Sequence, residues 1–148
     1  MNDIAYRTMV PTDYDVVFAL WKSCDGVGLN DIDDSQEGIA RYLRRNPTTC
    51  FVASRNCQIV GVILSGHDGR RGFIYHLAVH PECRRMGIAR KLVAMAADAL
   101  RNCGISKVAL VAFSRNISGN AFWEAMGFIR RDDLVYRNLP LRSTTNIK

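Results

Sequence analysis

The sequence predicts a single α/β domain in which a mixed, mostly antiparallel β-sheet carries helices on both faces. Strand-forming runs joined by turn signals fill the middle of the chain. A helical pattern of apolar residues follows, and another apolar strand comes after it. A strand, a helix and a strand within about 40 residues form a βαβ crossover, so we expect two parallel strands. The length of 148 residues fits one domain.

The N-terminal part of the chain predicts one strand and two helices. Residues 4–10 form the strand, and Thr12 or Asp13 can cap the helix that follows. The apolar positions of that first helix are Val16, Val17, Leu20, Trp21 and Cys24. Ser35 can cap the second helix, which must stop before Pro47.

The middle of the chain predicts an antiparallel meander. Residues 50–54 and 58–65 form two strands, and Asp68-Gly69 is a strong hairpin signal behind them. Residues 73–79 are almost uninterruptedly apolar, which is typical of a strand buried on both faces.

The crossover helix follows this buried strand. Apolar residues from Ile88 to Cys103 recur at helical spacing, and Gly104 is placed to end the helix. Residues 107–113 form the next strand.

The C-terminal part predicts a shorter helix and a closing pair of strands. The helix covers residues 118–126, and two strands turn at Asp132-Asp133 within residues 128–139. We expect one domain of residues 1–142 and a frayed tail of residues 143–148.

The composition disfavours several classes of protein. No run of about 18 apolar residues occurs, and the N-terminus lacks the apolar segment of a secretory signal, so we expect no membrane partner. The five cysteines form no CxxC pair, which favours free thiols in the cytoplasm and no metal site. The net charge of +6 comes from 16 arginines whose pairs are dispersed along the chain, so we expect no nucleic acid as a partner.

The most informative segment is residues 80–89, which connects the buried strand to the crossover helix. The first N–H groups of a helix have no partner within it, and the helix dipole favours anions there. Gly87 allows close approach of a phosphate, and Arg84 and Arg85 add positive charge. The segment therefore predicts a pyrophosphate site, with a basic strand-to-helix turn as the plainer alternative.

Two motifs in this part of the chain resemble those of the GNAT superfamily of N-acyltransferases. The hallmark Arg/Gln-x-x-Gly-x-Gly/Ala of its acetyl-CoA motif is similar to Arg84-Arg-Met-Gly-Ile-Ala89. Residues 116–128 resemble the second signature, an Asn followed by a short helix that ends in Gly-Phe. The resemblance covers nearly the whole chain and implies splayed central parallel strands.

The resemblance also implies which residues bind the cosubstrate acetyl-CoA. The N–H groups from Arg85 to Ala89 would hold its pyrophosphate, Leu77 and Val79 would pair with the pantetheine arm, and Asn116 would also bond that arm. The full implied set is Leu77, Val79, Arg84, Arg85, Met86, Gly87, Ile88, Ala89, Asn116, Phe122 and Trp123.

Acyl transfer to an amine requires a neutral amine and a donor for the oxyanion. The resemblance implies that the Val79 N–H faces the thioester oxygen and that the base position is Tyr75, where family members often have Glu. His76 lies beside it and titrates in the right range, although a core histidine or a water chain is an alternative reading. Strand alternation puts Tyr75 and His76 on opposite faces, so only one is expected to serve.

Trp123 stands where the family often has a tyrosine that protonates the leaving thiolate. An indole N–H is a hydrogen-bond donor but not a usable acid at neutral pH. We therefore expect Trp123 to pack against the thiol and to offer one hydrogen bond.

These observations predict an acetyl-CoA-dependent N-acetyltransferase that acts directly on a small or peptidic primary amine. The alternative is a non-catalytic acyl-CoA-binding or sensor domain. Asp25, Asp31, Asp33 and Asp34 would attract a cationic amine, or would only favour the start of the second helix. The oligomeric state stays open, with a homodimer as one option.

Overall fold

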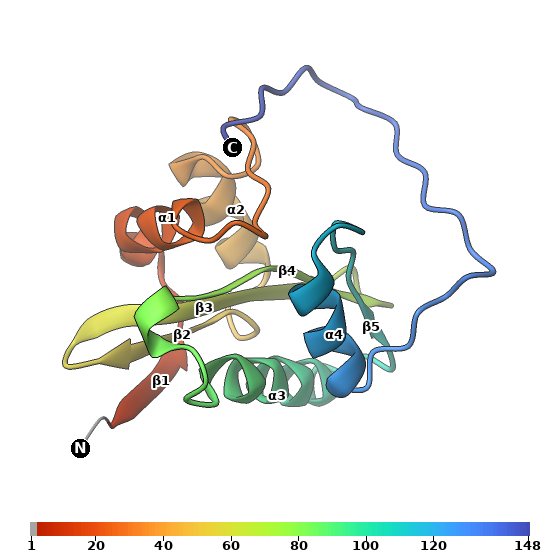
Figure 1. Cartoon of the computed structure of the whole chain (residues 1–148). Helices are drawn as coiled ribbons and strands as arrows, with labels where there is room; N and C mark the ends of the chain where they lie inside the picture. Colours follow the sequence, from red (N-terminus) through yellow and green to blue (C-terminus); the bar gives the residue numbers. More distant parts are fainter. Residues whose placement is uncertain (1–2) are drawn as a thin grey trace.

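The computed structural model describes residues 3–148 and shows a five-stranded sheet between two layers of helices (Figure 1). The strands, in their spatial order, are β1 (Ile4–Thr8), β2 (Phe51–Arg55), β3 (Gln58–His67), β4 (Gly72–Val79) and β5 (Val108–Ala109). Neighbouring strands are antiparallel except β4 and β5, which are parallel. The predicted mixed, mostly antiparallel sheet is confirmed.

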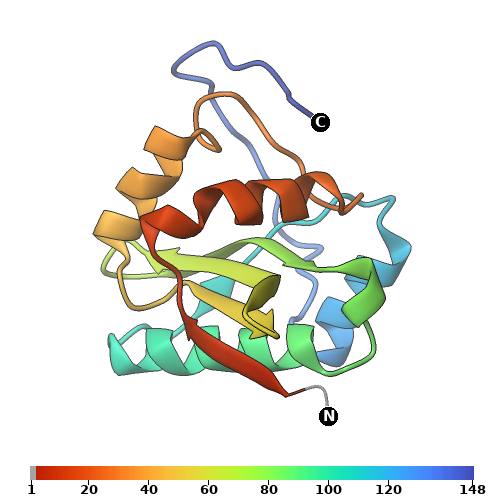
Figure 2. The ribbon, with the colours of Figure 1, turned by 90° about the vertical axis from the view of Figure 1, so that its left-hand side faces the viewer.

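Helices cover both faces of the sheet. They are α1 (Tyr14–Lys22), α2 (Gln36–Arg45), α3 (Ile88–Asn102) and α4 (Ile117–Ala125). Figure 2 shows α1 and α2 above the sheet and α3 below it. Because α3 connects the parallel strands β4 and β5, the predicted βαβ crossover is confirmed. Within residues 3–148, no helix is long and apolar enough to cross a membrane.

The core consists of one apolar layer on each face of the sheet. Val17 and Trp21 of α1 are fully buried on one side, and Leu92 of α3 is fully buried on the other. Each such side chain contributes about 1.5–3 kcal/mol by leaving water. Val16 was expected among the apolar positions of its helix, but it is 52% exposed because it lies beside the buried stripe of α1.

Local hydrogen bonds explain where the helices and the hairpin begin and end. The Ser35 hydroxyl accepts a 2.9 Å bond from the Gly38 N–H, which confirms the predicted cap of α2. Gly104 has a φ of 81°, and the Ile105 N–H bonds the Leu100 carbonyl at 3.0 Å, which closes α3. Asp68 accepts bonds from two backbone N–H groups in the predicted hairpin turn.

The first strand is shorter than predicted and ends at Thr8 rather than at residue 10. A 3₁₀ turn (Pro11–Asp13) intervenes before α1. The carboxylate of Asp13 accepts a 2.9 Å bond from the Val10 N–H and two 2.8 Å bonds from Arg7. Asp13 therefore holds the turn and does not cap α1 with its side chain.

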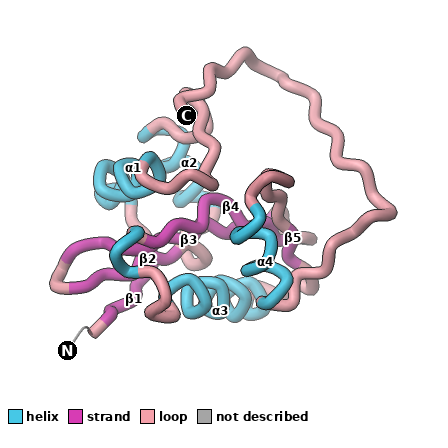
Figure 3. The backbone as a smooth tube through the Cα atoms, in the orientation of Figure 1, coloured by secondary structure: helices cyan, strands magenta, loops and turns pink. Residues whose placement is uncertain are grey.

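Two strands predicted near the C-terminus are corrected by the structure. Only Val108–Ala109 of the predicted strand 107–113 pairs with a neighbour. Residues 128–139 form no strand, and Figures 1 and 3 show them as part of a long irregular arc. Because β5 has only two residues, it offers too few backbone groups for a further strand to pair beside it.

The end of this arc returns to the loop between α1 and α2. Asn146 forms a β-bridge with Asn30, and the Ile147 N–H bonds the Leu29 carbonyl at 2.9 Å. The segment for which the sequence predicts a frayed end thus contacts the loop that precedes α2.

Candidate active site

A cavity of about 1020 Å³ lies where the chain after β5 diverges from β4. The two strands pair only at Gly72–Val108 and at Phe73–Ala109. Beyond these pairs, one wall is formed by β4 and the other by residues 110–113 and α4. The predicted splay of the parallel strands is therefore present and opens this cavity.

A β-bulge shapes the β4 wall of this cavity. The pairing of β3 and β4 shifts register between Val62 and Leu64, and His76 has a φ of 50°. The Trp21 indole donates a 3.2 Å bond to the His76 carbonyl, which holds the bulge. A positive φ is strained for a residue other than glycine, and it persists only where surrounding contacts impose it.

The bulge corrects the prediction that Tyr75 and His76 lie on opposite faces. Their ring centroids are 6.2 Å apart, and both rings contact aromatic residues of the α1–α2 layer, namely Tyr42 and Trp21. The extra residue of a bulge interrupts strict alternation, so two successive side chains share one face. Tyr75 is also 44% exposed, so β4 is not buried on both faces as predicted.

The surroundings of Tyr75 shift the pKa of its phenol. Burial raises the pKa of the Tyr75 phenol above its ordinary value near 10, and nearby Tyr136 and Asp33 raise it further. The phenol is therefore protonated at neutral pH. It can donate a proton or a hydrogen bond but is unsuited to act as a base.

The strand-to-helix turn lies at one end of the cavity. Gly87 has a φ of 78°, and a Cβ added there would meet no atom within 4 Å. The first hydrogen bond of α3 runs from the Lys91 N–H to the Gly87 carbonyl, so the N–H groups before Lys91 are available to an anion. Arg84, Arg85 and Arg90 line the cavity against one acidic lining residue, Asp25.

Aromatic side chains of α4 form the opposite wall. Trp123 makes edge-on contacts with Phe122 at 5.1 Å and with Phe128 at 5.0 Å, and Phe122 and Trp123 line the cavity. The Asn116 side chain caps α4 by accepting a 3.0 Å bond from the Gly119 N–H. Its amide oxygen is therefore engaged, and its Nδ2 is the atom left to bond a ligand.

The loop after α1 closes the cavity from the side of the α1–α2 layer. A Cβ at Gly26 would lie 2.7 Å from Asn116 Nδ2, and one at Gly28 would lie 3.1 Å from the Phe113 ring. Small residues at both positions let this loop approach the chain after β5. The Cys24 thiol lies in the same region and bonds the Val79 carbonyl at 3.6 Å.

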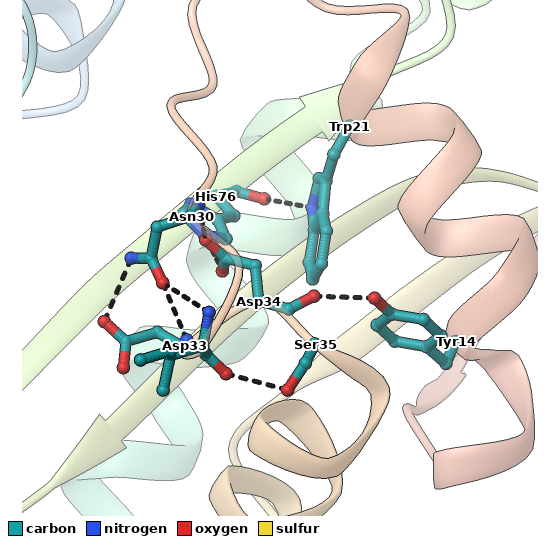
Figure 4. Close-up of polar contacts among 8 residues, drawn as sticks. Tyr14, Trp21, Asn30, Asp33, Asp34, Ser35 and His76 are labelled. Carbon is teal, nitrogen blue, oxygen red and sulfur yellow. Dashed lines mark hydrogen bonds and ion pairs between the residues drawn. The ribbon is translucent and has the colours of Figure 1, made fainter. Parts of the chain in front are cut away.

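His76 is paired with the buried carboxylate of Asp34, which lies in the loop before α2 (Figure 4). Its Nε2 lies 2.6 Å from Asp34 Oδ1. Asp34 Oδ2 accepts a 2.8 Å bond from the Asn30 N–H, and the Asp34 carbonyl accepts a 2.6 Å bond from the Tyr14 hydroxyl. The pair is thus held by α1, by the loop before α2 and by β4.

The structure brings almost all the predicted site residues to this one cavity. Met86 is the exception, because its side chain turns toward Arg55 at 3.9 Å and does not line the cavity. The lining residues from the predicted set are Tyr75, His76, Leu77, Val79, Arg84, Arg85, Gly87, Ile88, Ala89, Asn116, Phe122 and Trp123.

The four carboxylates of the acidic cluster lie in different surroundings. Asp25 lines the cavity, whereas Asp34 is buried against His76. Asp31 accepts a bond from the Thr145 N–H, and Asp33 accepts one from the Asn30 side chain. Three of the four carboxylates are therefore engaged in holding the loop.

Sequence reasoning missed the pairing of Asp34 with His76 and the contribution of residues 23–28 to the cavity. The acidic cluster was visible in the sequence, but its spacing gave no sign of a contact across 42 residues. Within residues 3–148, no group of three or more His, Cys, Asp or Glu side chains is arranged to hold a metal ion.

Comparison with known proteins identifies the family. Residues 14–128 match the acetyltransferase (GNAT) family. The chain belongs to the GNAT family. It is 34% identical over 116 residues to an acetyltransferase of Pectobacterium atrosepticum, covering 78% of this chain and 81% of that protein. It is 39% identical over 105 residues to an acetyltransferase of Photorhabdus laumondii, covering 71% and 72% of the two chains.

Solved structures share the GNAT fold. Ard1 from Thermoplasma volcanium superimposes with a TM-score of 0.76 at 21% identity, covering 85% of this chain and 82% of that one. Glucosamine-6-phosphate N-acetyltransferase from Arabidopsis thaliana gives a TM-score of 0.70 at 15% identity, covering 93% and 99%. The chain is therefore an acetyltransferase built on the GNAT fold.

Proposed function

We propose that this GNAT protein moves an acetyl group from acetyl-CoA directly to the primary amine of a small molecule or a peptide. The observation that carries the proposal is the single cavity that joins the start of α3 to the bulge of β4 and to Trp123. One end suits a pyrophosphate, and the other presents titratable and aromatic groups where acyl transfer can occur.

The residues around α3 fit the phosphate part of acetyl-CoA. We assign its pyrophosphate to the N–H groups from Arg85 to Ala89, with Arg84 and Arg85 neutralising its charge. Met86 would take part through its backbone alone, because its side chain lies outside the cavity. An aliphatic side chain at Gly87 would fill the open space that an anion needs.

The strand β4 and the helix α4 fit the pantetheine arm and the thioester. We assign the backbone of Leu77 and Val79 to the arm, and the Val79 N–H to the thioester oxygen, where negative charge develops during transfer. Asn116 Nδ2 is the proposed donor to the arm from the opposite wall. Phe122 and Trp123 would pack against the acyl and thiol end.

The acceptor is proposed to be a primary amine, which must lose a proton before it attacks. A lysine amine has a pKa near 10.4 and an α-amine one near 8, so the site needs a proton acceptor. A solved GNAT structure with 17% identity is an aminoglycoside N-acetyltransferase in complex with CoA, and another acts on glucosamine-6-phosphate. These acceptors differ in kind, so the fold alone does not select among aminosugars, aminoglycosides and peptide N-termini.

The experiment is a measurement of free CoA release from acetyl-CoA against a panel of these amine classes, with mass spectrometry of the acetylated product. We expect one class to give saturable release above the hydrolysis seen without amine. A protein that binds acetyl-CoA but acetylates no amine in the panel would favour the non-catalytic, acyl-CoA-binding alternative.

We also propose a cytoplasmic location. All five cysteines are free, and three of them, Cys24, Cys50 and Cys83, are buried in the core. Free thiols in these numbers are typical of a reducing compartment.

A further inference from the structure

The strongest unassigned feature of the cavity is the ion-pair geometry of Asp34 and His76. His76 Nε2 lies 2.6 Å from Asp34 Oδ1, a distance typical of a charge-assisted hydrogen bond. The side chains are 6% exposed for Asp34 and 16% exposed for His76. A carboxylate this deeply buried requires a partner, and His76 is that partner.

The contact fixes the tautomer of the His76 ring. An ionised carboxylate can only accept hydrogen bonds, so the proton of the contact must reside on Nε2. When the ring is neutral, its lone pair is therefore on Nδ1. Within residues 3–148, the structure shows no hydrogen bond to Nδ1.

The position of the ring directs this basic nitrogen away from the carboxylate. His76 lines the cavity, whereas the buried Asp34 does not, so the basic nitrogen belongs to the member of the pair that borders the cavity. The orientation is held from several sides. Trp21 packs edge-on against the ring at 4.9 Å and bonds its backbone carbonyl, and Asn30 holds the second oxygen of Asp34.

The backbone of β4 contributes to the same arrangement. His76 adopts a φ of 50°, a conformation that costs a residue other than glycine of order 1–3 kcal/mol. Without this bulge, strand alternation would send the ring to the α3 side of the sheet, away from Asp34. The strained residue is thus the one whose side chain meets the carboxylate and which also borders the cavity.

We propose that Asp34 is a positioning residue that makes His76 the proton acceptor for the amine. The inference rests on the proposed function and deepens it. His76 Nδ1 takes a proton from the ammonium group, and the neutral amine then attacks the thioester carbon. The C–N bond forms, the C–S bond breaks, and the electron pair leaves with sulfur as the CoA thiolate. One of the two protons left on the nitrogen passes to that thiolate, the other stays in the amide, and His76 returns its proton to water.

The pair also supplies charge stabilisation during the reaction. The imidazolium formed by proton uptake lies 2.6 Å from a carboxylate that is shielded from solvent. Tyr75 cannot take this role because its phenol is protonated at neutral pH, as described above. The base is therefore His76, whose Nε2 is held by Asp34 and whose Nδ1 has no hydrogen bond within residues 3–148.

The test compares three variants of the full chain. Asp34→Asn is nearly isosteric, and its amide oxygen can keep the bond from the Asn30 N–H. Its NH₂ group then faces Nε2 and forces the ring proton onto Nδ1. Asp33→Asn is the matched control, because it removes the same charge from the neighbouring, exposed position. His76→Gln removes the base but can still donate to Asp34.

Steady-state kinetics give the first readout. Both His76→Gln and Asp34→Asn should lower kcat by about 10²–10⁴-fold, the usual contribution of a general base, with the KM for acetyl-CoA unchanged. Asp33→Asn should keep the wild-type kcat. Wild-type kcat in Asp34→Asn would overturn the inference while leaving the proposed function intact. A wild-type protein that acetylates no amine would overturn both.

The second readout is the position of the ring proton of His76, measured by nitrogen NMR. A purely structural role for Asp34 would leave that position unchanged in Asp34→Asn. We expect the neutral wild-type ring to be protonated on Nε2 and the ring of Asp34→Asn to be protonated on Nδ1. A wild-type ring protonated on Nδ1 would overturn the inference, and this observation needs no variant to fold.

Discussion

Replacing Gly87 with glutamate should weaken acetyl-CoA binding by about two orders of magnitude and leave the fold in place. Gly87 is the residue immediately before α3 and has a φ of 78°. A Cβ there would meet no atom within 4 Å, so the new side chain would extend into the open space at the end of the cavity. That space is where we place the pyrophosphate.

The magnitude follows from the charges and the backbone. A left-handed conformation costs a residue other than glycine about 1–2 kcal/mol, which lowers stability without unfolding a typical domain. A carboxylate about 5 Å from two negative charges, at an effective dielectric constant of about 40, is repelled by about 3 kcal/mol. This repulsion corresponds to roughly 200-fold weaker binding.

Calorimetric titration with CoA measures this loss, and Gly104→Glu is the matched control. Gly104 has a φ of 81°, and a Cβ there also meets no atom within 4 Å. It lies after the opposite end of α3, so the variant has the same backbone cost and the same added charge at a site remote from the cavity. We expect wild-type CoA affinity in Gly104→Glu. Unchanged CoA affinity in Gly87→Glu would show that the pyrophosphate site is misplaced.

Three further predictions concern other parts of the molecule. Trp123→Phe should keep most of kcat, because the indole packs against the thiol and is no acid; a loss of more than about a thousandfold with acetyl-CoA binding intact would refute this. Gly61→Val should destabilise the fold by about 1–3 kcal/mol in urea unfolding, because its Cβ would lie 2.9 Å from Ile88. An unchanged urea midpoint would contradict the close packing of β3 and α3. Arg7→Gln should lower stability at neutral pH by about 1–2 kcal/mol, since it removes two hydrogen bonds to the buried carboxylate of Asp13.

The pH dependence of the Arg7 effect has a defined sign. Burial opposes ionisation of Asp13, but hydrogen bonds from Arg7 and from the Val10 N–H lower its pKa overall. The stability that this pair contributes is therefore fully present above the unfolded pKa of about 3.9 and is lost as the pH falls through the lower folded pKa. The free energies of unfolding of the wild type and of Arg7→Gln, measured in urea, should converge at acidic pH. If the two free energies of unfolding differed by the same amount at every pH, Asp13 would not be the group through which Arg7 stabilises the fold.

The elements that the sequence predicted well are those with a local physical signal. Ser35 begins α2 and Gly104 follows the end of α3. In each case the hydrogen bond that defines the helix end joins residues only a few positions apart in the chain. The Asp68-Gly69 turn is equally local. The cosubstrate end of the cavity was predicted for the same reason, because the arginines, Gly87 and the start of α3 are contiguous in the chain.

The elements that the sequence predicted poorly depend on contacts between distant segments. Strict strand alternation separated Tyr75 from His76, but the bulge and the Trp21 bond override it. Nothing in the spacing of the acidic loop indicated that Asp34 would meet His76. Residues 128–139 have strand-like composition, yet a strand also needs a neighbouring ladder, which the short β5 does not provide.

A crystal structure of the protein with CoA tests the central claim most directly. We expect the pyrophosphate against the first turn of α3 beside Arg84 and Arg85, and the thiol between the bulge of β4 and Trp123. CoA bound outside this cavity, or bound within it with the thiol directed away from His76, would contradict the account.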